Sequence, residues 1–164
     1  MKTVVFELLK KHHTRKGFDC GYSALNNYLK LRSGQELRKN IAFPYMMTFE
    51  NENEVIGYYT LSATSVALDE LPENYTKITR HKSVPAVLIG RLAIKKNLQG
   101  KGYGKLLLLN ALRRISHSRG FAVMMVVVES KDKTSSAFYS QYGFMDLGSE
   151  TSHMFLPYKT IQKL

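Results

Sequence analysis

The stretch Gln99-Gly100-Lys101-Gly102-Tyr103-Gly104 decides the fold, because its three alternating glycines stand between two regular elements. Residues 85–95 before it form an apolar run that predicts a buried strand, and residues 102–118 after it predict a helix that Gly120 ends. A strand that leads through glycines into a helix directs backbone N–H groups at one spot, where an anion can bind. Glycine also lets a phosphate approach the backbone, because no Cβ stands in the way. The stretch therefore predicts a phosphate-binding loop, and its alternative is a glycine-rich turn without a ligand.

The spacing within this loop excludes two familiar nucleotide loops. A Walker loop needs a hydroxyl residue after its lysine, but Leu106 follows Lys105. A dinucleotide fingerprint needs Gly-x-Gly-x-x-Gly, and neither Gly100 nor Gly102 begins that spacing. The spacing Gln-x-x-Gly-x-Gly does occur, and it resembles the signature of the Gcn5-related N-acetyltransferase (GNAT) family. The resemblance implies that acetyl-coenzyme A (acetyl-CoA) is the cofactor.

Further regular elements are predicted on both sides of the loop. Strands are predicted over residues 3–9, 42–50, 54–65, 121–128, 144–147 and 154–156. Helices are predicted from Tyr22 to about Asn40, with a break or kink at Gly34, and over residues 133–142. Residues 66–84 read as a loop with one helical turn. With the GNAT resemblance, this order implies an α/β fold in a single domain over residues 1–164, with a mixed, mostly antiparallel sheet flanked by helices.

The net charge of +11 is concentrated in one third of the chain. Residues 1–73 hold equal numbers of basic and acidic residues, and so do residues 129–164. Residues 74–128 hold eleven Lys and Arg residues and no Asp or Glu. Such a concentration attracts polyanions. Its alternative is a solvated basic surface that aids solubility.

The N-terminal part carries a more specific resemblance. The segments Phe18-Asp19-Cys20-Gly21, Leu25-Asn26-Asn27-Tyr28-Leu29 and Ile56-Gly57-Tyr58-Tyr59-Thr60-Leu61 are similar to segments of the acetyltransferase toxins of type II toxin–antitoxin systems. The resemblance implies that the acceptor is the amino group of aminoacyl-tRNA, whose acetylation blocks translation. It also implies a ribbon-helix-helix antitoxin as partner and a homodimer.

The basic third supplies candidates for contact with RNA phosphates. They are Lys77, Arg80, Lys82, Lys95, Lys96, Arg113, Arg114 and Arg119. Arg91 is a further candidate. It stands inside an apolar strand, where a charged side chain needs either a place at the substrate groove or a buried carboxylate as its partner.

The resemblance to the GNAT family also assigns the cofactor site. The strand end Arg91-Leu92-Ala93-Ile94 resembles the family strand whose backbone binds the pantetheine arm, which assigns Leu92, Ala93 and Ile94 to the cofactor. The pyrophosphate would be held by Gln99, Gly100, Lys101, Gly102, Tyr103, Gly104 and Lys105.

Tyr139 is the candidate for the general acid. Residues 137–144 resemble the family's late helix and the turn that follows it. A phenol is protonated at neutral pH, so Tyr139 can donate a proton to the departing thiolate. The alternatives are a packing role for Tyr139 and Tyr142 as the acid. A backbone N–H near residues 92–94 is the expected donor to the oxyanion.

The need for a base depends on the acceptor. An α-amino group has a pKa near 7.7–8.0, so roughly a tenth of it is neutral at pH 7, whereas a lysine with a pKa near 10.4 is almost wholly protonated. An aminoacyl acceptor therefore needs no strong base, and a lysine acceptor does. Glu129 ends the predicted central strand and is the one obvious candidate for a base. Its alternative role is that of a solvated carboxylate.

The remaining features suggest no further chemistry. The histidines are scattered, and none has metal-ligand spacing, so no metal site is expected. His12 and His13 lie in a basic segment that is predicted to be exposed, and Cys20 is expected to be a buried small residue. The N-terminus lacks the features of a signal peptide, and no apolar run approaches the roughly 20 residues that span a bilayer. We therefore expect a cytoplasmic protein without a membrane partner.

Two other functions remain open at the level of the sequence. One is N-acetylation of a small amine or of a protein N-terminus, although the basic third argues against a polyamine. The other is a non-catalytic regulator that binds CoA or nucleic acid, although the presence of Tyr139 and of the glycine loop argues against an inactive enzyme.

Overall fold

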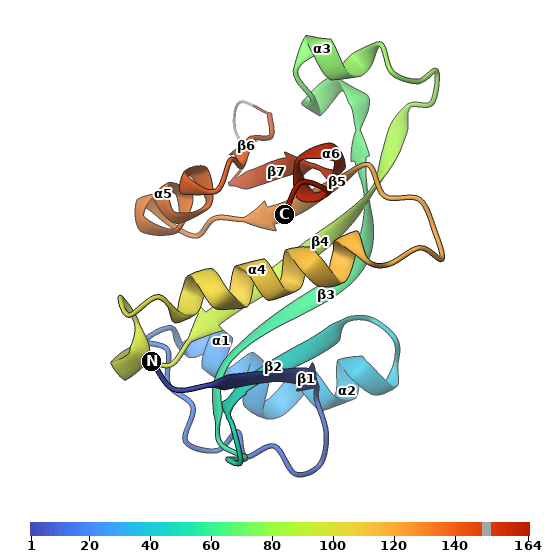
Figure 1. Cartoon of the computed structure of the whole chain (residues 1–164). Helices are drawn as coiled ribbons and strands as arrows, with labels where there is room; N and C mark the ends of the chain where they lie inside the picture. The colour runs from blue at the N-terminus through green and yellow to red at the C-terminus, as the bar shows by residue number, and fades with distance from the viewer. Residues whose placement is uncertain (149–151) are drawn as a thin grey trace. The chain divides into compact units, whose positions relative to one another are not determined.

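The computed structural model describes residues 1–148 and 152–164. Within them, the strands are β1 (Val4–Leu8), β2 (Phe43–Phe49), β3 (Val55–Ala67), β4 (Ser83–Ile94), β5 (Met125–Glu129), β6 (Met145–Asp146) and β7 (His153–Pro157) (Figure 1). They hydrogen-bond in the order β1-β2-β3-β4-β5-β7-β6. β4 and β5 pair in parallel, whereas the β1–β2, β2–β3, β5–β7 and β6–β7 pairs are antiparallel. The predicted α/β class with a mixed, mostly antiparallel sheet is confirmed.

The helices are α1 (Ser23–Asn27), α2 (Ser33–Arg38), α3 (Glu73–Thr76), α4 (Tyr103–Ser116), α5 (Lys133–Gln141) and α6 (Tyr158–Ile161). A π-helical segment, η1 (Tyr28–Arg32), joins α1 to α2, and two 3₁₀ turns are η2 (Leu68–Glu70) and η3 (Lys96–Leu98). In the described part of the chain, no helix has the length and apolar character needed to cross a membrane. The chain forms two compact units: unit 1 comprises Met1–Ser62 and Gly90–Leu112, and unit 2 comprises Ala63–Ile89 and Arg113–Leu164.

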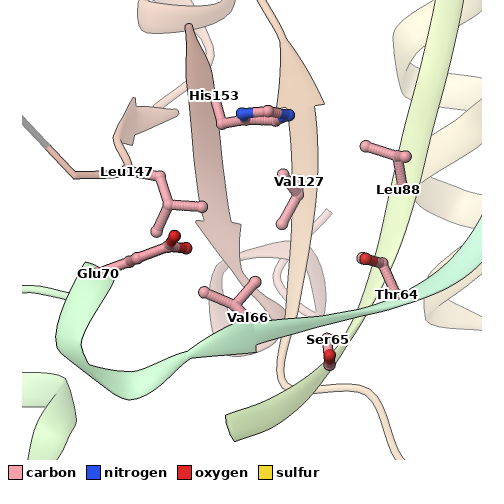
Figure 2. Close-up of a pocket in the computed structure, with 8 residues that line it drawn as sticks. All are labelled: Thr64, Ser65, Val66, Glu70, Leu88, Val127, Leu147 and His153. Carbon is pink, nitrogen blue, oxygen red and sulfur yellow. The ribbon is translucent and has the colours of Figure 1, made fainter. Parts of the chain in front are cut away.

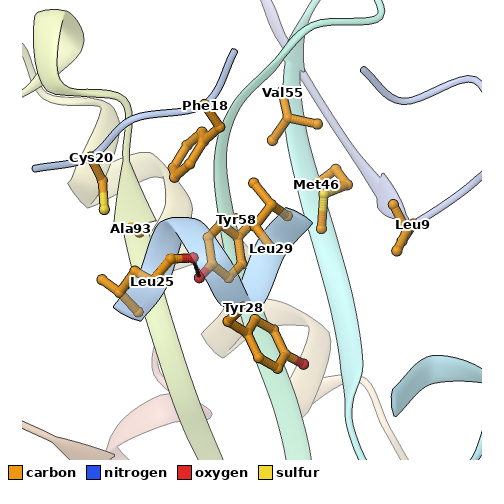
Figure 3. Close-up of a cluster of buried hydrophobic side chains, with 10 residues drawn as sticks. All are labelled: Leu9, Phe18, Cys20, Leu25, Tyr28, Leu29, Met46, Val55, Tyr58 and Ala93. Carbon is orange, nitrogen blue, oxygen red and sulfur yellow. Dashed lines mark hydrogen bonds between the residues drawn. The ribbon is translucent and has the colours of Figure 1, made fainter. Parts of the chain in front are cut away.

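Unit 1 is organised around two neighbouring tyrosines of β3. Successive residues of a strand point to opposite faces of the sheet. The Tyr58 hydroxyl donates to the Leu25 carbonyl oxygen at 2.7 Å, within a buried cluster that α1 and η1 share with the sheet (Figure 3). The Tyr59 hydroxyl donates to Asn110 Oδ1 in α4, also at 2.7 Å. The two hydroxyls therefore fix α1 on one face of β3 and α4 on the other.

The break in the first helical region lies in η1 and not at Gly34. The Ser33 N–H donates to the Tyr28 carbonyl oxygen five residues earlier, which is the π-helical pattern. The Leu29 carbonyl oxygen accepts from Ser33 Oγ at 2.6 Å and from Arg15 Nη1 at 3.1 Å. Arg15 Nη1 also donates to Ser33 Oγ at 2.8 Å. The predicted break or kink at Gly34 was wrong, because Gly34 lies within α2. The irregular turn comes before it, in η1, where these side-chain bonds stabilise the wider π-helical geometry.

Ser33→Ala is expected to lower the free energy of unfolding by about 1–3 kcal/mol. The Ser33 side chain is fully buried, and its loss leaves Arg15 and the Leu29 carbonyl oxygen short of a partner. Urea unfolding of both proteins measures the difference. Ser23→Ala, at the exposed first residue of α1, is the matched control and should change stability by less than about 0.5 kcal/mol. Equal values for the two variants would show that the buried hydroxyl does not support η1.

In unit 2, β4 and β5 pair from Ala86↔Met125 to Ile89↔Val128. The strand predicted over residues 121–128 begins only at Met125, and Phe121 is 63% exposed. Pro85 explains the difference. Its carbonyl oxygen accepts the Met124 N–H at 2.9 Å, but a proline has no N–H with which to extend the ladder on that side.

Helix α5 of unit 2 has well-defined ends. Asp132 and Ser135 form a reciprocal capping box at its start. Gly143 follows its end at a φ of +94°, in the left-handed region that favours glycine. Ser136 Oγ lies 3.8 Å from Met154 Sδ, so α5 packs on the face of β7 that carries Met154. The predicted helix over residues 133–142 and its stop at Gly143 are confirmed.

Candidate functional site

The glycine loop of unit 1 has the geometry of a phosphate cradle. Gly100 and Gly102 have φ angles of +73° and +90°, which favour glycine. A Cβ placed on Gly100 would meet nothing within 4 Å, so the space before the backbone is open. Helix α4 begins at Tyr103, and the N–H groups of its first turn have no acceptor within the helix. These amides and the positive end of the helix dipole can receive an anionic group.

Gln99 holds this loop in place. Its side-chain Nε2 donates to the Ile94 carbonyl oxygen at 2.9 Å and to the Cys20 carbonyl oxygen at 2.8 Å. An amide nitrogen has two N–H groups, and both are used here. Gln99 therefore ties the loop to the end of β4 and to the segment before α1, and its side-chain nitrogen has no donor left for a phosphate.

The end of β4, which carries Leu92, Ala93 and Ile94, lies close against β3. A Cβ placed on Gly57 would lie 2.8 Å from Ile94 Cδ1 and 3.2 Å from the Ala93 carbonyl oxygen. A larger residue at Gly57 would therefore displace the Ile94 side chain and crowd the Ala93 carbonyl oxygen. Ala93 and Ile94 are buried and Leu92 is half-buried, so the backbone proposed to contact the pantetheine arm is firmly held.

Tyr139 lies in α5 of unit 2 and is 5% exposed. Its ring centroid lies 5.3 Å from that of Phe138 and 5.5 Å from that of Phe144. Burial raises the pKa of Tyr139 well above its ordinary value, so the hydroxyl stays protonated and can donate a proton. Tyr142 stands just beyond the helix as its C-cap and is half-buried.

A pocket of about 260 Å³ lies within unit 2 (Figure 2). It is lined by Thr64, Ser65, Val66, Glu70, Leu88, Val127, Leu147 and His153. Glu129 is paired in register with His153, so their side chains share this face of the sheet. Met154, the neighbour of His153, points to the opposite face, on which α5 packs. The pocket therefore opens on the face of unit 2 away from Tyr139's helix.

The polar members of this pocket were not predicted. His153 and Glu70 are 83 residues apart and follow no motif. Only the β5–β7 register brings His153 opposite Glu129, and the sequence gives no sign of that register. Glu129 is the last residue of β5 and is exposed, so it lies at the end of a strand, as the sequence predicted.

The predicted phosphate-binding residues are divided between the units. Unit 1 contains Arg91, Lys95, Lys96, Lys101 and Lys105, and unit 2 contains Lys77, Arg80, Lys82, Arg113, Arg114 and Arg119. Lys95 Nζ forms an ion pair with Glu54 Oε1, so its charge already has a partner. Arg91 stacks on the Tyr28 ring, with its guanidinium carbon 3.6 Å from the ring centroid, and lies 4.0 Å from Glu36. The carboxylate near Arg91 is thus half-buried, whereas one of the two predictions required a buried carboxylate as its partner.

Glu7, His12 and His13 form a cluster in unit 1 that the sequence did not indicate. The Nε2 atoms of His12 and His13 lie 2.9 and 3.0 Å from Glu7 Oε1. The His13 side chain is fully buried, so the prediction of an exposed His13 was wrong. His13 Nδ1 accepts the Lys10 N–H at 2.9 Å, so a neutral His13 carries its proton on Nε2 and donates to Glu7. A metal at Nε2 would require loss of that proton, and the cluster as folded is a hydrogen-bond network.

The profile of the acetyltransferase (GNAT) family matches residues 5–144, and the chain belongs to this family. Acetyl transfer from acetyl-CoA is the chemistry of this class of protein. The open, positively charged loop before α4 fits the pyrophosphate of that cofactor.

Relatives of known description are similar over almost the whole chain. A protein named "Probable toxin TacT" from Sinorhizobium fredii (strain NBRC 101917 / NGR234) is 34% identical over 173 residues, which cover 99% of this chain and 95% of that protein. The solved structure "AtaT complexed with acetyl-methionyl-tRNAfMet" is 30% identical, with a TM-score of 0.91 over 98% of both chains. A structure of the AtaT Y144F mutant toxin bound to the C-terminus of the antitoxin AtaR is 29% identical, with a TM-score of 0.82 over 98% of this chain and 96% of that chain.

Proposed function

We propose that this protein transfers the acetyl group of acetyl-CoA to the amino group of aminoacyl-tRNA, and that it thereby blocks translation as the toxin of a toxin–antitoxin pair. The likeness to AtaT complexed with acetyl-methionyl-tRNAfMet, at a TM-score of 0.91, carries the proposal. The eleven basic residues without a carboxylate over residues 74–128 support it, because tRNA is a polyanion.

The chain's own residues have distinct roles in this proposal. Acetyl-CoA supplies an activated acetyl group. The amides of Gly100 to Gly104, together with Lys101 and Lys105, hold its pyrophosphate. The amino nitrogen of the acceptor bonds to the acetyl carbon as the C–S bond breaks, and the nitrogen releases one proton to solvent. Tyr139 donates a proton to the departing thiolate, and a backbone N–H within residues 92–94 donates to the oxygen on which negative charge develops.

The pocket in unit 2 is the proposed place for the side chain of the aminoacyl group. Because the pocket lies on the face away from α5, the amino group must extend past the end of β5 to reach the thioester beside Tyr139. Its wall of Val66, Leu88, Val127 and Leu147 suits an apolar side chain. Glu129 ends β5 and His153 begins β7 on the same face, so that the carboxylate lies where it can attract the amino group of the acceptor. An α-amine is partly neutral at pH 7, so Glu129 need not act as a strong base.

Transfer to charged tRNA tests the function directly. With radiolabelled acetyl-CoA, we expect the purified protein to label aminoacyl-tRNA and not the same tRNA after deacylation. The apolar pocket predicts faster labelling of apolar aminoacyl groups than of acidic ones. Efficient labelling of a polyamine or an antibiotic, without labelling of any aminoacyl-tRNA, would contradict the proposal and favour a small-amine acetyltransferase.

We further propose a ribbon-helix-helix antitoxin as partner, a homodimeric state and a cytoplasmic location. The antitoxin-bound structure of an AtaT variant supports an antitoxin as partner, and the free, buried Cys20 suits a reducing compartment. Co-purification with the product of a neighbouring reading frame tests the partner, and sedimentation equilibrium tests the dimer. A monomer at all concentrations would exclude the homodimer.

A further inference from the structure

Three side chains from three elements of unit 1 form a compact cluster around Arg91. The Arg91 guanidinium carbon lies 3.6 Å from the centroid of the Tyr28 ring. The Tyr28 hydroxyl donates to Glu36 Oε1 at 3.0 Å, and Arg91 Nη1 lies 4.0 Å from that same oxygen. Tyr28 belongs to η1, Glu36 to α2 and Arg91 to β4, so the cluster joins the first helical region to the sheet.

The hydrogen-bonding capacity of Arg91 is not used by the protein. A guanidinium has five N–H donors in its plane, and stacking on a ring engages its face and not its edge. Glu36 Oε1, at 4.0 Å, is beyond hydrogen-bond distance and already accepts from Tyr28. Within residues 1–148 and 152–164, the guanidinium donates no hydrogen bond, although 31% of the side chain is exposed. Arg91 is thus a fixed cation whose donors remain available.

The surrounding structure maintains this arrangement at some cost. An arginine on a half-buried strand loses hydration, and a π-helical turn is rarely adopted without a reason. Here Ser33 and Arg15 stabilise the turn, and the turn presents Tyr28 beneath Arg91. Burial, and then the hydrogen bond to Glu36, raise the pKa of Tyr28, so its hydroxyl stays a donor and Glu36 stays anchored.

We propose that Arg91 binds a phosphate group of a substrate through its available N–H donors, with Tyr28 fixing the plane of the guanidinium and Glu36, 4.0 Å away, balancing the Arg91 charge before the phosphate binds. The planar fork matches two phosphate oxygens at once. The phosphate belongs either to the 3′-terminal phosphodiesters of the acceptor RNA or to the cofactor. Only the first source rests on the proposed function.

Paired substitutions with opposite expected signs test the proposal. Arg91→Gln should weaken binding of the phosphate ligand by about 10- to 100-fold, as loss of a charge-assisted bidentate contact does. Glu36→Gln keeps an oxygen for the Tyr28 hydroxyl and removes the competing charge, so it should strengthen binding of that ligand. Arg91→Lys keeps the charge without the planar fork and should lie between Arg91→Gln and the parent protein. Arg38→Gln, an exposed position of α2, is the matched control for the change in charge.

Two binding assays, both independent of acetyl transfer, identify the source of the phosphate. The first measures the affinity for an acceptor-stem RNA hairpin with a single-stranded 3′ end over a series of salt concentrations, and Arg91→Gln should reduce the salt slope by about one. The second measures the affinity for CoA by calorimetry. A loss for either ligand supports the site and names its source. Melting temperatures of all variants control for folding.

Two results would overturn the proposal. In one, Arg91→Gln changes neither affinity. In the other, Arg91→Gln and Glu36→Gln weaken binding to the same extent. That result would show that the two residues only stabilise the structure as an ion pair. A parent protein that binds no RNA would contradict the proposed function, and the CoA assay would still decide the inference about Arg91.

Discussion

Tyr139→Phe is expected to lower kcat for acetyl transfer by about 10²- to 10⁴-fold, the usual contribution of a general acid. The substitution removes only the hydroxyl, and the ring keeps its packing against Phe138 and Phe144. Affinity for CoA and melting temperature should therefore stay close to those of the parent protein. Steady-state kinetics with a saturating acceptor, together with calorimetry, measure the two quantities.

Tyr142→Phe is the matched control, because Tyr142 lies half-buried at the end of the same helix. It should leave kcat nearly unchanged, and the reverse result would identify Tyr142 as the general acid.

The direction of the Tyr139 pKa shift adds a second check. An acid with a raised pKa stays protonated at every pH below that value, so kcat should show no loss from Tyr139 between about pH 6 and pH 9. Loss of rate on the alkaline side of this range must then come from another group.

Gly100→Val is expected to weaken CoA binding by about 10- to 100-fold, the loss of one or two charge-assisted hydrogen bonds of about 1.5 kcal/mol each. A β-branched residue disfavours the φ of +73° at this position, and its side chain would occupy the open space before the backbone amides. Both effects act on the approach of the pyrophosphate. Calorimetric titration with CoA measures the change without any acceptor.

Gly120→Val provides the control for this prediction. Gly120 is exposed, a Cβ there would meet nothing within 4 Å, and its φ lies outside the left-handed region. The control variant should bind CoA as the parent protein does. If Gly100→Val also bound CoA normally, the pyrophosphate could not lie against the loop before α4.

The local features of this fold were predictable from the sequence. The glycine loop, the helix after it, and α5 with its stop at Gly143 all follow from capping residues and glycines within a few positions of each other. The parts that depend on distant partners were not. The apolar run from Phe121 indicated a strand, but the strand starts only where Pro85 on β4 permits pairing. The segment around His13 looked exposed because the sequence does not show that Glu7 folds back onto it.

The cluster around Arg91 could not be predicted for a different reason. The sequence indicated that Arg91 needs a partner, but an ordinary helix would not bring Tyr28 and Glu36 together at a spacing of eight residues. The π-turn inserts an extra residue and so places both on one face. That turn depends on the Ser33 and Arg15 side chains, which no pattern of hydrophobic residues reveals.

The adjacent tyrosines of β3 have a consequence for folding fidelity. Because the two tyrosines are adjacent, a slip of β3 by one residue would bring one of them into the position of the other, so that only one of the two acceptors could be bonded. The wrong alignment would leave the other phenol without its acceptor, a substantial penalty in free energy. The pair therefore makes misaligned pairing of β2 with β3 unfavourable during assembly, because α1 and α4 can both form their hydrogen bonds to β3 only when the hairpin is correctly aligned.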